Sequence, residues 1–420
     1  MVTAFAGLDV GTTSSKAVVY RADGVVLGTG RADTTWDTGR DGTQIDAESL
    51  CRSAFDALSA AATAAAVPVA AVGVTSMGES GVLVDGHERV LAPVIAWHDG
   101  RDDAEVADLA AAIGADTFGG IAGKPLRGQF SLTKHRWLLR HVPLSRAATT
   151  RFDVGGWVVR RLGGDAVLEL SLAGRTGWLD VASRDWWDDA LDWSGATRAL
   201  MPPLVGAGVA VGSVTSEAVS PHLRGAVLTL AGHDHQAAAL GARANDEGVE
   251  LDSSGTAEAL VRTVAAVPAR ADVARLAAAG ITTDPSIEPG RWNLLGGTEG
   301  GLAQLRVLER FGVDPGDVAE LDAAAERPGS ERGAEWRAVV AAAADEASAL
   351  HQAMDDVVGP AVRVVVTGGW RHSAEVMRAK AARFGPVEVS AVEEAGALGA
   401  ATLAARAIDA IGPHDHLGQP

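Results

Sequence analysis

The first part of the chain alternates short hydrophobic runs with polar turns. Residues 4–10 form a hydrophobic run, a Gly-Thr-Thr-Ser-Ser turn follows, and residues 16–20 form a second run rich in β-forming residues. Asp23-Gly24 then turns the chain into a third hydrophobic run at residues 25–27. Short hydrophobic runs separated by turn residues are typical of strands joined by hairpins, so these segments predict three antiparallel strands in succession.

A helix and a further strand are predicted next. The apolar face of the helix consists of Leu50, Ala54, Phe55 and Leu58. Asp46 is placed to cap its N-terminus, and residues 70–75 predict a buried strand. Three connected antiparallel strands, followed by alternating helix and strand, resemble the opening of a ribonuclease-H-like domain.

A comparable order of elements begins again in the second half. Residues 226–231 predict a strand that ends at Gly232-His233-Asp234, and residues 236–244 predict a helix. Residues 248–253 predict a strand before a second turn that contains Gly-Thr. Because both halves place a strand before a Gly-Thr turn, the pattern indicates a duplicated unit.

We therefore predict an α/β fold of two ribonuclease-H-like domains with a central cleft. The division lies near Ser220-Pro221, so that the first domain comprises residues 1–223 and the second residues 224–420. Within the second domain, the alanine-rich segment 265–278 predicts a helix, and residues 302–310 predict another.

The composition is that of a folded globular protein with an acidic surface. Hydrophobic residues make up 47% of the chain and charged residues 21%, with a formal net charge of -18. This charge repels phosphate backbones and anionic lipids, which argues against nucleic acid and membrane surfaces as partners. Cys51 is the single cysteine, so an internal disulfide is excluded. We expect neither a leader nor a membrane-spanning segment, and a cytoplasmic protein.

The first Gly-Thr turn carries a pattern suited to phosphate. Asp9 ends the first predicted strand, and Gly11, Thr12, Thr13 and Lys16 follow it. A tight turn of small residues presents backbone N–H groups to phosphate oxygens, and a carboxylate at the strand end can meet hydrated Mg²⁺. The alternative is an ordinary hairpin in which these residues only make the turn. No Walker A string occurs in the chain.

This turn and the later motifs resemble the FGGY family of carbohydrate kinases, within the actin, hexokinase and Hsp70 superfamily. The resemblance extends over essentially the whole chain, and the motifs stand in the family's order. They are residues 9–16, 72–79, 95–101, 131–137, 232–234, 254–258, 366–370 and 394–401. The match departs from the family pattern at Gln129 and His135.

The resemblance implies that Asp234 is the catalytic base. Phosphoryl transfer to an alcohol needs a proton acceptor near the nucleophile, and Asp234 stands where a predicted strand gives way to a helix. That position also suits a helix N-cap. A metal site is a third interpretation because His233 and His235 flank Asp234, although no third neutral ligand stands nearby.

Sugar hydroxyls that enter a desolvated pocket must keep their hydrogen bonds, so the substrate needs polar partners. The predicted substrate-binding residues are Met77, Gly78, Glu79, Trp97, Asp99, Arg101 and His235. Glu79 follows a buried strand and matches a polyol-binding position of the family, and Trp97 would cover C–H groups of the sugar. Asp99 and Arg101 could instead pair with each other on the surface.

The nucleotide is expected to be ATP with Mg²⁺, and Asp9 is the predicted metal contact. The predicted ATP-binding residues are Thr12, Thr13, Lys16, Gly255, Thr256, Gly297, Thr298, Gly368, Gly369, Trp370 and Ser373. Each glycine could instead serve only a backbone with positive φ. Lys16 could be an ordinary surface lysine at the start of a strand.

The resemblance implies ATP-dependent phosphorylation of a hydroxyl of a small sugar or polyol. The middle segments resemble the ketose-kinase branch, such as L-fuculose and D-xylulose kinases. Three alternatives stay open: a glycerol or polyol kinase, an actin-like nucleotide-binding switch, and a catalytically weak relative that acts as a sugar-binding regulator. The partner expected is a small-molecule substrate, and a homodimer is left open.

Overall fold

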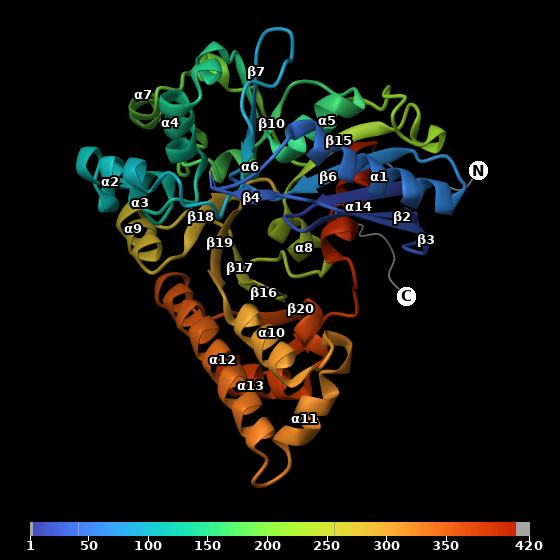
Figure 1. The fold of residues 1–420 in the computed structure, drawn as a ribbon, viewed down its shortest axis with the longest axis vertical. Helices are drawn as coiled ribbons and strands as arrows, with labels where there is room; N and C mark the ends of the chain where they lie inside the picture. The colour runs from blue at the N-terminus through green and yellow to red at the C-terminus, as the bar shows by residue number, and fades with distance from the viewer. Residues whose placement is uncertain (1–2, 41, 256, 409–420) are drawn as a thin grey trace.

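A computed structural model describes residues 3–40, 42–255 and 257–408 of the chain. Two six-stranded sheets form its framework. In Figure 1 the first half of the chain builds the upper part around one sheet. The second sheet and the helices of the second half extend below it (Figure 1).

The first sheet contains β1 (Ala4–Val10), β2 (Ser14–Arg21), β3 (Val26–Asp33), β6 (Ala71–Ser76), β14 (Ala210–Ser213) and β15 (Val227–His233). Their order is β14-β15-β6-β1-β2-β3. β15, β6 and β1 are parallel, whereas β1, β2 and β3 form the predicted antiparallel series. The central strand β1 is buried at every residue except Asp9, which is partly exposed at its carboxyl end.

The second sheet contains β16 (Val249–Ser254), β17 (Glu258–Val264), β18 (Thr282–Pro285), β19 (Trp292–Thr298), β20 (Arg363–Thr367) and β21 (Val387–Val389). Their order is β18-β19-β17-β16-β20-β21. β16 pairs antiparallel with β17 and parallel with β20, as β1 pairs with β2 and β6. The two Gly-Thr turns therefore occupy equivalent hairpins of a duplicated fold, which confirms the predicted fold class.

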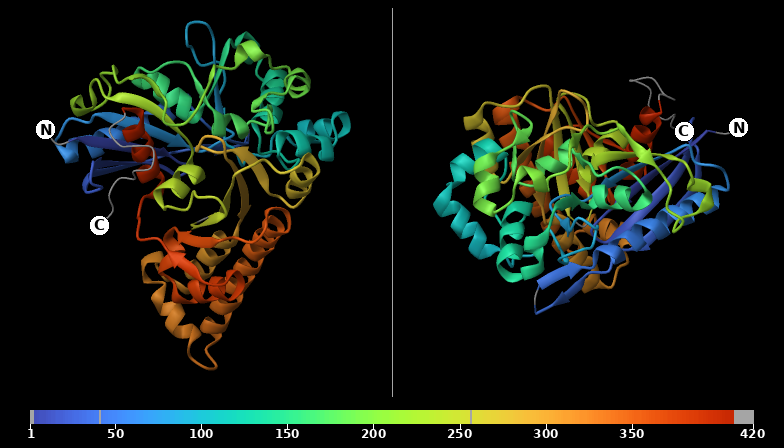
Figure 2. Two further views of the ribbon diagram at one scale, coloured as in Figure 1. Left: turned by 180° about the vertical axis from the view of Figure 1, so that it is seen from behind. Right: turned by 90° about the horizontal axis from the view of Figure 1, so that it is seen from above.

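The first sheet includes a strand that lies beyond residue 223, where the sequence analysis places the domain boundary. β15 follows that point and pairs with β6 in the first sheet. The last helix, α14 (Ala395–Ala407), also packs against β1 and β6. Figure 2 shows it from behind, beside the N-terminal strands. The division into residues 1–223 and 224–420 stays a prediction.

The other helices pack on the two sheets or against one another. They are α1 (Ala47–Ala65), α2 (Asp103–Ala112), α3 (Ala115–Ala122), α4 (Ser131–His141), α5 (Val154–Leu162), α6 (Leu170–Gly174), α7 (Asp188–Ser194), α8 (Asp234–Gly241), α9 (Arg270–Ala278), α10 (Gly300–Phe311), α11 (Ala319–Ala325), α12 (Glu331–Val358) and α13 (Ala374–Phe384). Asp46 caps α1 as predicted, because its side chain accepts a hydrogen bond from Ser49 N.

Short strands connect the site segments. They are β4 (Asp37–Gly39), β5 (Gly42–Ile45), β7 (Gly81–Val84), β8 (Val94–Ile95), β9 (Thr150–Asp153), β10 (Leu168–Glu169), β11 (Leu179–Asp180), β12 (Asp185–Trp186) and β13 (Leu204–Val205). β5 pairs with β8, and β7 pairs with β9. Through these pairs, β7 and β8, which both follow β6 in the chain, are held against β9 and β5.

The helix predicted over residues 265–278 begins later than expected. α9 starts at Arg270, whereas β17 continues to Val264 through its pairing with Trp292. Pro268 lies between them and lacks a backbone N–H for a helical hydrogen bond. Alanine content alone therefore overestimated the helix. Within the described residues, no helix is both long and apolar enough to cross a membrane.

Candidate active site

Three predicted segments meet at one edge of the first sheet because three of its strands are parallel. The register pairs Asp9 with Thr75, and Thr75 in turn pairs with Gly232. The carboxyl ends of parallel strands lie at the same edge of a sheet. Asp9, the loop that carries Glu79, and Asp234 therefore come together, although they are far apart in the sequence.

Asp234 is the first residue of α8, and His233 takes the N-cap position before it. Its Oδ1 accepts a hydrogen bond of 2.7 Å from the backbone N–H of His235, and its side chain is 23% exposed. Burial raises the pKa of Asp234 to about 7, and the charge of Glu79 adds to the rise. A carboxylate with this pKa, within reach of a ligand, can act as a general base near neutral pH.

The end of β15 is held in place by hydroxyl groups. Ser171 Oγ accepts a hydrogen bond of 3.0 Å from the backbone N–H of His233 and donates one of 2.5 Å to Glu169. Thr75 Oγ1 donates a hydrogen bond of 2.7 Å to the carbonyl of Gly232. These contacts fix the backbone immediately before Asp234.

Asp9 provides a suitable place for a divalent cation. Its Oδ1 is buried and has no hydrogen-bond partner among the described residues. A Cβ at Gly396 would lie 2.5 Å from Asp9 Oδ2, so only glycine lets the first turn of α14 approach this closely. Burial raises the pKa of Asp9 to about 7, and Asp234 adds to the rise. An unpaired carboxylate oxygen near a second carboxylate fits hydrated Mg²⁺.

The two histidines beside Asp234 do not build a metal cluster with it. Their rings lie 5.5 Å apart. Burial lowers the pKa of His235 to about 4 and that of His233 well below its usual value, so both rings are neutral. Within residues 3–40, 42–255 and 257–408, no group of three or more His, Cys, Asp or Glu side chains could hold a metal ion.

Glu79 lies in the loop between β6 and β7 with a left-handed backbone, at φ 63°. The residue before it must be small, because a Cβ at Gly78 would lie 2.9 Å from Arg175 Cγ. The Glu79 side chain is 4% exposed, and its Oε1 accepts hydrogen bonds from Gln129 and Arg175. The carboxylate is therefore fixed in position and close enough to Asp234 to raise its pKa.

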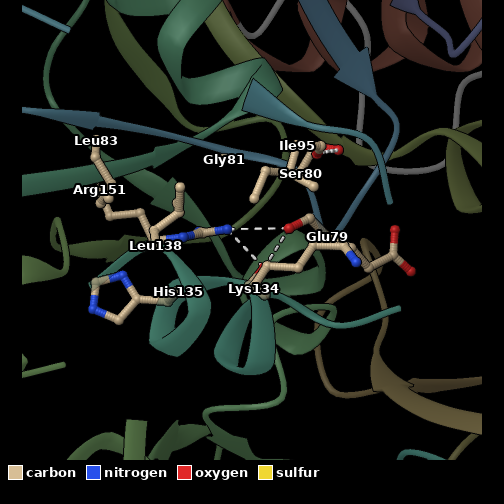
Figure 3. Close-up of a pocket in the computed structure, with 10 residues that line it drawn as sticks. Glu79, Ser80, Gly81, Leu83, Ile95, Lys134, His135, Leu138 and Arg151 are labelled. Carbon is tan, nitrogen blue, oxygen red and sulfur yellow. Dashed lines mark hydrogen bonds between the residues drawn. The ribbon is translucent and has the colours of Figure 1, made fainter. Parts of the chain in front are cut away.

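The backbone carbonyl of Glu79 accepts hydrogen bonds from two side chains (Figure 3). Ser131 Oγ donates a hydrogen bond of 2.5 Å to it, and Arg151 Nη2 donates one of 3.2 Å. His135 lines the small pocket on this side of the loop (Figure 3). Burial lowers the pKa of His135 to about 3, so the neutral ring packs edge-on against Trp178 as a core residue.

Trp97 and Trp36 hold the first Gly-Thr turn. Trp97 Nε1 donates a hydrogen bond of 2.9 Å to Thr12 Oγ1, and Trp36 Nε1 donates one of 2.6 Å to the Thr12 carbonyl. Thr12 Oγ1 also lies 3.8 Å from the sulfur of the buried Met77. Trp97 and Met77, predicted for the substrate, thus contact a residue predicted for the nucleotide. Thr13, next in the turn, is exposed.

Asp99 and Arg101 pair with each other, but the pair is buried and does not lie on the surface as the second interpretation had it. Arg101 Nε donates a hydrogen bond of 2.7 Å to Asp99 Oδ1, and both side chains are buried. Burial alone would raise the pKa of Asp99, but hydrogen bonds from Arg101 and the Thr43 N–H lower it to about 2. The pair therefore joins its loop to the β4–β5 hairpin.

Lys16 forms an ion pair with Glu394, next to the first turn of α14. Lys16 Nζ and Glu394 Oε2 are 2.9 Å apart, and the side chains are 33% and 37% exposed. An ion pair this exposed contributes only about 0–1 kcal/mol. A bound phosphate group could therefore replace Glu394 as the partner of Lys16 at little cost.

Gly255, Gly368 and Trp370 lie together at the second Gly-Thr hairpin. Trp370 Nε1 donates a hydrogen bond of 2.9 Å to the Gly255 carbonyl, and its ring is buried. A Cβ at Gly368 would lie 2.2 Å from the Ser254 carbonyl, so glycine permits this close approach. Trp370 thus supports the hairpin from within the core. Thr256 lies outside the described residues.

The remaining predicted nucleotide residues differ in their surroundings. Thr298 Oγ1 donates a hydrogen bond of 3.1 Å to Glu258 across the β17–β19 pair. Gly297 is exposed, and no atom lies within 4 Å of a Cβ at Gly369, so both have room for a ligand. Ser373 is buried and caps α13 with its side chain.

The sequence analysis missed three residues that the structure brings into the site. They are Trp36, which holds Thr12; Ser171, which holds the end of β15; and Arg175, which holds Glu79. No local pattern distinguishes them, because their partners lie far away in the chain. Arg175 is 96 positions from Glu79.

The geometry agrees with what comparison with known proteins finds. Residues 4–241 match the model of the FGGY family of carbohydrate kinases, N-terminal domain. The chain belongs to the FGGY family of carbohydrate kinases. The match includes the strand that carries Asp9, the loop that carries Glu79, and the first residue of α8, Asp234.

Curated relatives of this FGGY chain include glycerol kinases. The glycerol kinase of Aromatoleum aromaticum is 32% identical over 275 residues, which cover 62% of this chain and 54% of the relative. That of Methylorubrum extorquens is 30% identical over 271 residues, covering 61% and 53%. The chain thus spans about half the length of the curated relatives it matches.

Solved structures of other kinases share the fold. The xylulose kinase from Rhodospirillum rubrum superposes with a TM-score of 0.83 at 23% identity, covering 98% of this chain and 92% of that chain. The Plasmodium falciparum glycerol kinase with ADP gives 0.87 at 17% identity, covering 99% and 91%. At these identities the likeness supports the two-domain fold alone.

Proposed function

We propose that this FGGY chain is an ATP-dependent kinase that phosphorylates a hydroxyl of a small sugar, in the first place a ketose. The observation that carries the proposal is the meeting of Asp9, Glu79 and Asp234 at one edge of the first sheet. Alcohol phosphorylation requires a proton acceptor, a metal contact and hydrogen-bond partners for the substrate. The three carboxylates supply one of each.

Asp234 is the general base of this reaction. It accepts the proton of the substrate hydroxyl while the hydroxyl oxygen forms a bond to the γ-phosphorus. The bond from that phosphorus to the bridging oxygen breaks, and ADP leaves with the bond electrons. Glu79 accepts hydrogen bonds from neighbouring hydroxyls of the substrate, which keeps them satisfied after they leave water.

The nucleotide is held between the two Gly-Thr hairpins. Backbone N–H groups near Thr13 and the ammonium of Lys16 bind phosphate oxygens on one side, and Gly255, Gly297 and Gly369 face the nucleotide on the other. Asp9 would hold Mg²⁺, and the ion would supply positive charge that offsets the charge of the phosphates.

A polyol kinase is the second candidate, and the curated relatives favour it. Both relatives named above are glycerol kinases. A screen for ADP release with D-xylulose, L-fuculose and glycerol separates the two candidates by their kcat/KM. ATP hydrolysis that none of these acceptors accelerates would support the nucleotide-switch alternative and contradict the kinase proposal.

The general-base role is tested with Asp234→Asn. A positioned general base contributes about 10²- to 10⁴-fold, so kcat should fall by that factor while affinity for ADP changes little. Asp46→Asn is the matched control, because Asp46 is a capping aspartate of α1, remote from Asp234 in the sequence. Turnover by Asp234→Asn within threefold of the wild-type rate would show that another group takes the proton.

A further inference from the structure

Arg175 lies at the centre of a buried chain of charges that reaches both sheets. It follows α6, and its side chain is 2% exposed. On one side it donates two hydrogen bonds to Glu79, and on the other it donates to Thr282 and Asp284 of β18. A charge this deeply buried needs ion-pair partners on both sides to offset its lost hydration.

The contact with Glu79 leaves one carboxylate oxygen available. Oε1 accepts from Arg175 Nε at 3.0 Å, from Arg175 Nη2 at 2.5 Å and from Gln129 Nε2 at 2.9 Å. Among the described residues, Oε2 accepts no hydrogen bond, and it is not one of the fully buried oxygens that lack a partner. Arg175 and Gln129 therefore occupy Oε1 and leave Oε2 without a donor among the described residues.

The far side of the guanidinium is fixed as firmly. Arg175 Nη1 donates over 2.9 Å to Asp284 Oδ2 and over 2.7 Å to Thr282 Oγ1. Lys124 Nζ lies 2.6 Å from Asp284 Oδ1, with its side chain fully buried. Asp284 thus has a cation on each oxygen, and Arg175 cannot turn away from Glu79 without breaking a pair with β18.

We propose that Arg175 is the positioning residue of the sugar site, which orients Glu79 Oε2 towards the substrate hydroxyls and anchors the Glu79 loop to β18 of the second sheet. The inference rests on the proposed substrate-binding function of Glu79. It adds that sugar recognition depends on a residue that does not touch the sugar, and that the anchor comes from the other half of the molecule.

The test is Arg175→Lys, which keeps the charge but loses the planar donor pattern that reaches both partners. Loss of one hydrogen bond to a charged group changes a binding constant about tenfold. The KM for the acceptor should therefore rise about tenfold. D-xylulose and glycerol are the acceptors measured. The KM for ATP should stay within twofold, because Arg175 has no hydrogen bond or ion pair with the predicted nucleotide residues that the structure describes.

Arg262→Lys is the matched control. Arg262 is equally buried, at 1% exposure, and forms a pair of 2.5 Å with Glu250 within the second sheet. If both variants lose stability, the shared loss reflects the removal of a buried arginine and not the role of Arg175. Hydrogen–deuterium exchange over residues 77–81, measured on the full chain without substrate, should quicken in Arg175→Lys and stay unchanged in Arg262→Lys.

The outcomes separate the two proposals. Unchanged exchange over residues 77–81, or an acceptor KM equal to that of Arg262→Lys, would overturn the role of Arg175. If the wild-type chain phosphorylates no acceptor, the proposed kinase function fails, while the exchange measurement still decides whether Arg175 positions the loop. If Arg175→Lys does not fold, Asp284→Asn, which weakens the same anchor, is measured in its place.

Discussion

At the scale of single residues, burial and neighbouring charge determine what the two aspartates at the sheet edge can do. Burial raises the pKa of both Asp9 and Asp234 to about 7, and their mutual repulsion contributes to the rise at Asp9. A divalent cation near Asp9 would favour its ionised form. Asp234 would keep a pKa near the working pH, which suits proton transfer.

Asp9→Asn should therefore separate catalysis from stability. Removing a preorganised electrostatic contact lowers kcat by about 10²- to 10³-fold. The rate of ADP release with Mg²⁺ should therefore fall by that factor. The free energy of unfolding in urea at pH 8 should not fall, because the variant no longer buries an unpaired charge. Asp33→Asn, at an exposed position of β3, is the control. A rate within threefold of wild type would contradict the metal-contact role.

At the scale of elements, small residues let α14 lie directly on the first sheet. A Cβ at Gly7 would be 1.7 Å from the Ala397 carbonyl, and one at Gly73 would be 2.0 Å from the Ala400 carbonyl. Both contacts are with backbone, which cannot move aside as a side chain can. This close packing also brings the start of α14 against Asp9.

Gly73→Ala should therefore be strongly destabilising. Overpacking in a tight core costs about 1–3 kcal/mol, and a backbone clash belongs at the upper end, so we expect a loss of at least about 2 kcal/mol in urea unfolding. Gly86→Ala provides the comparison, because no atom lies within 4 Å of its Cβ; its effect should stay within about 0.5 kcal/mol. Equal stability of the two variants would be inconsistent with this packing.

The short helix α6 makes a pH-dependent contribution through its N-cap. Glu169 is fully buried and accepts hydrogen bonds from the backbone N–H groups of Ser171 and Leu172. Burial raises the pKa of Glu169 from 4.5 to about 7 despite these hydrogen bonds. The folded state thus holds the proton more tightly than the unfolded state does.

The sign of the pH effect follows from this shift. The contribution of Glu169 is complete below pH 4.5 and is lost as pH rises to about 7, a change of about 3 kcal/mol. The wild-type free energy of unfolding should fall between about pH 4.5 and pH 7, and Glu169→Gln should show a smaller fall. Parallel pH profiles for the two proteins, measured by urea unfolding, would exclude this origin.

At the scale of the whole molecule, the two sheets meet through charged contacts as well as through the chain. Arg175 joins Glu79, in the loop after β6 of the first sheet, to Asp284 in β18 of the second sheet. Ligands that bind between the halves should therefore stabilise the molecule as one unit.

ADP with Mg²⁺ provides the corresponding measurement. A ligand at 100 times its Kd raises the free energy of unfolding by about 2.7 kcal/mol if it binds the folded state alone. We expect a rise of this size with ADP and Mg²⁺, and a smaller one when EDTA removes the metal. Asp9→Asn should show the smaller rise under both conditions. An equal rise with and without EDTA in the wild type would argue against a metal at Asp9.

The sequence by itself determined the order of the strands, the two Gly-Thr hairpins and the positions of Asp9, Glu79 and Asp234. These features depend on local patterns, because hydrophobic runs, turn residues and caps act over a few positions. The three opening strands and the Asp46 cap form as predicted. The helix predicted over residues 236–244 is α8, which runs from Asp234 to Gly241. At residues 265–269 strand pairing and a proline prevailed over alanine content.

Only the tertiary structure decided which charges meet. Asp99 pairs with Arg101, Lys16 with Glu394, and Arg175 with both Glu79 and Asp284. The partners of Arg175 lie 96 and 109 positions away, so no local pattern could select them. Burial removes water from these groups and makes each choice of partner costly to change, and burial exists only after the two halves have folded together.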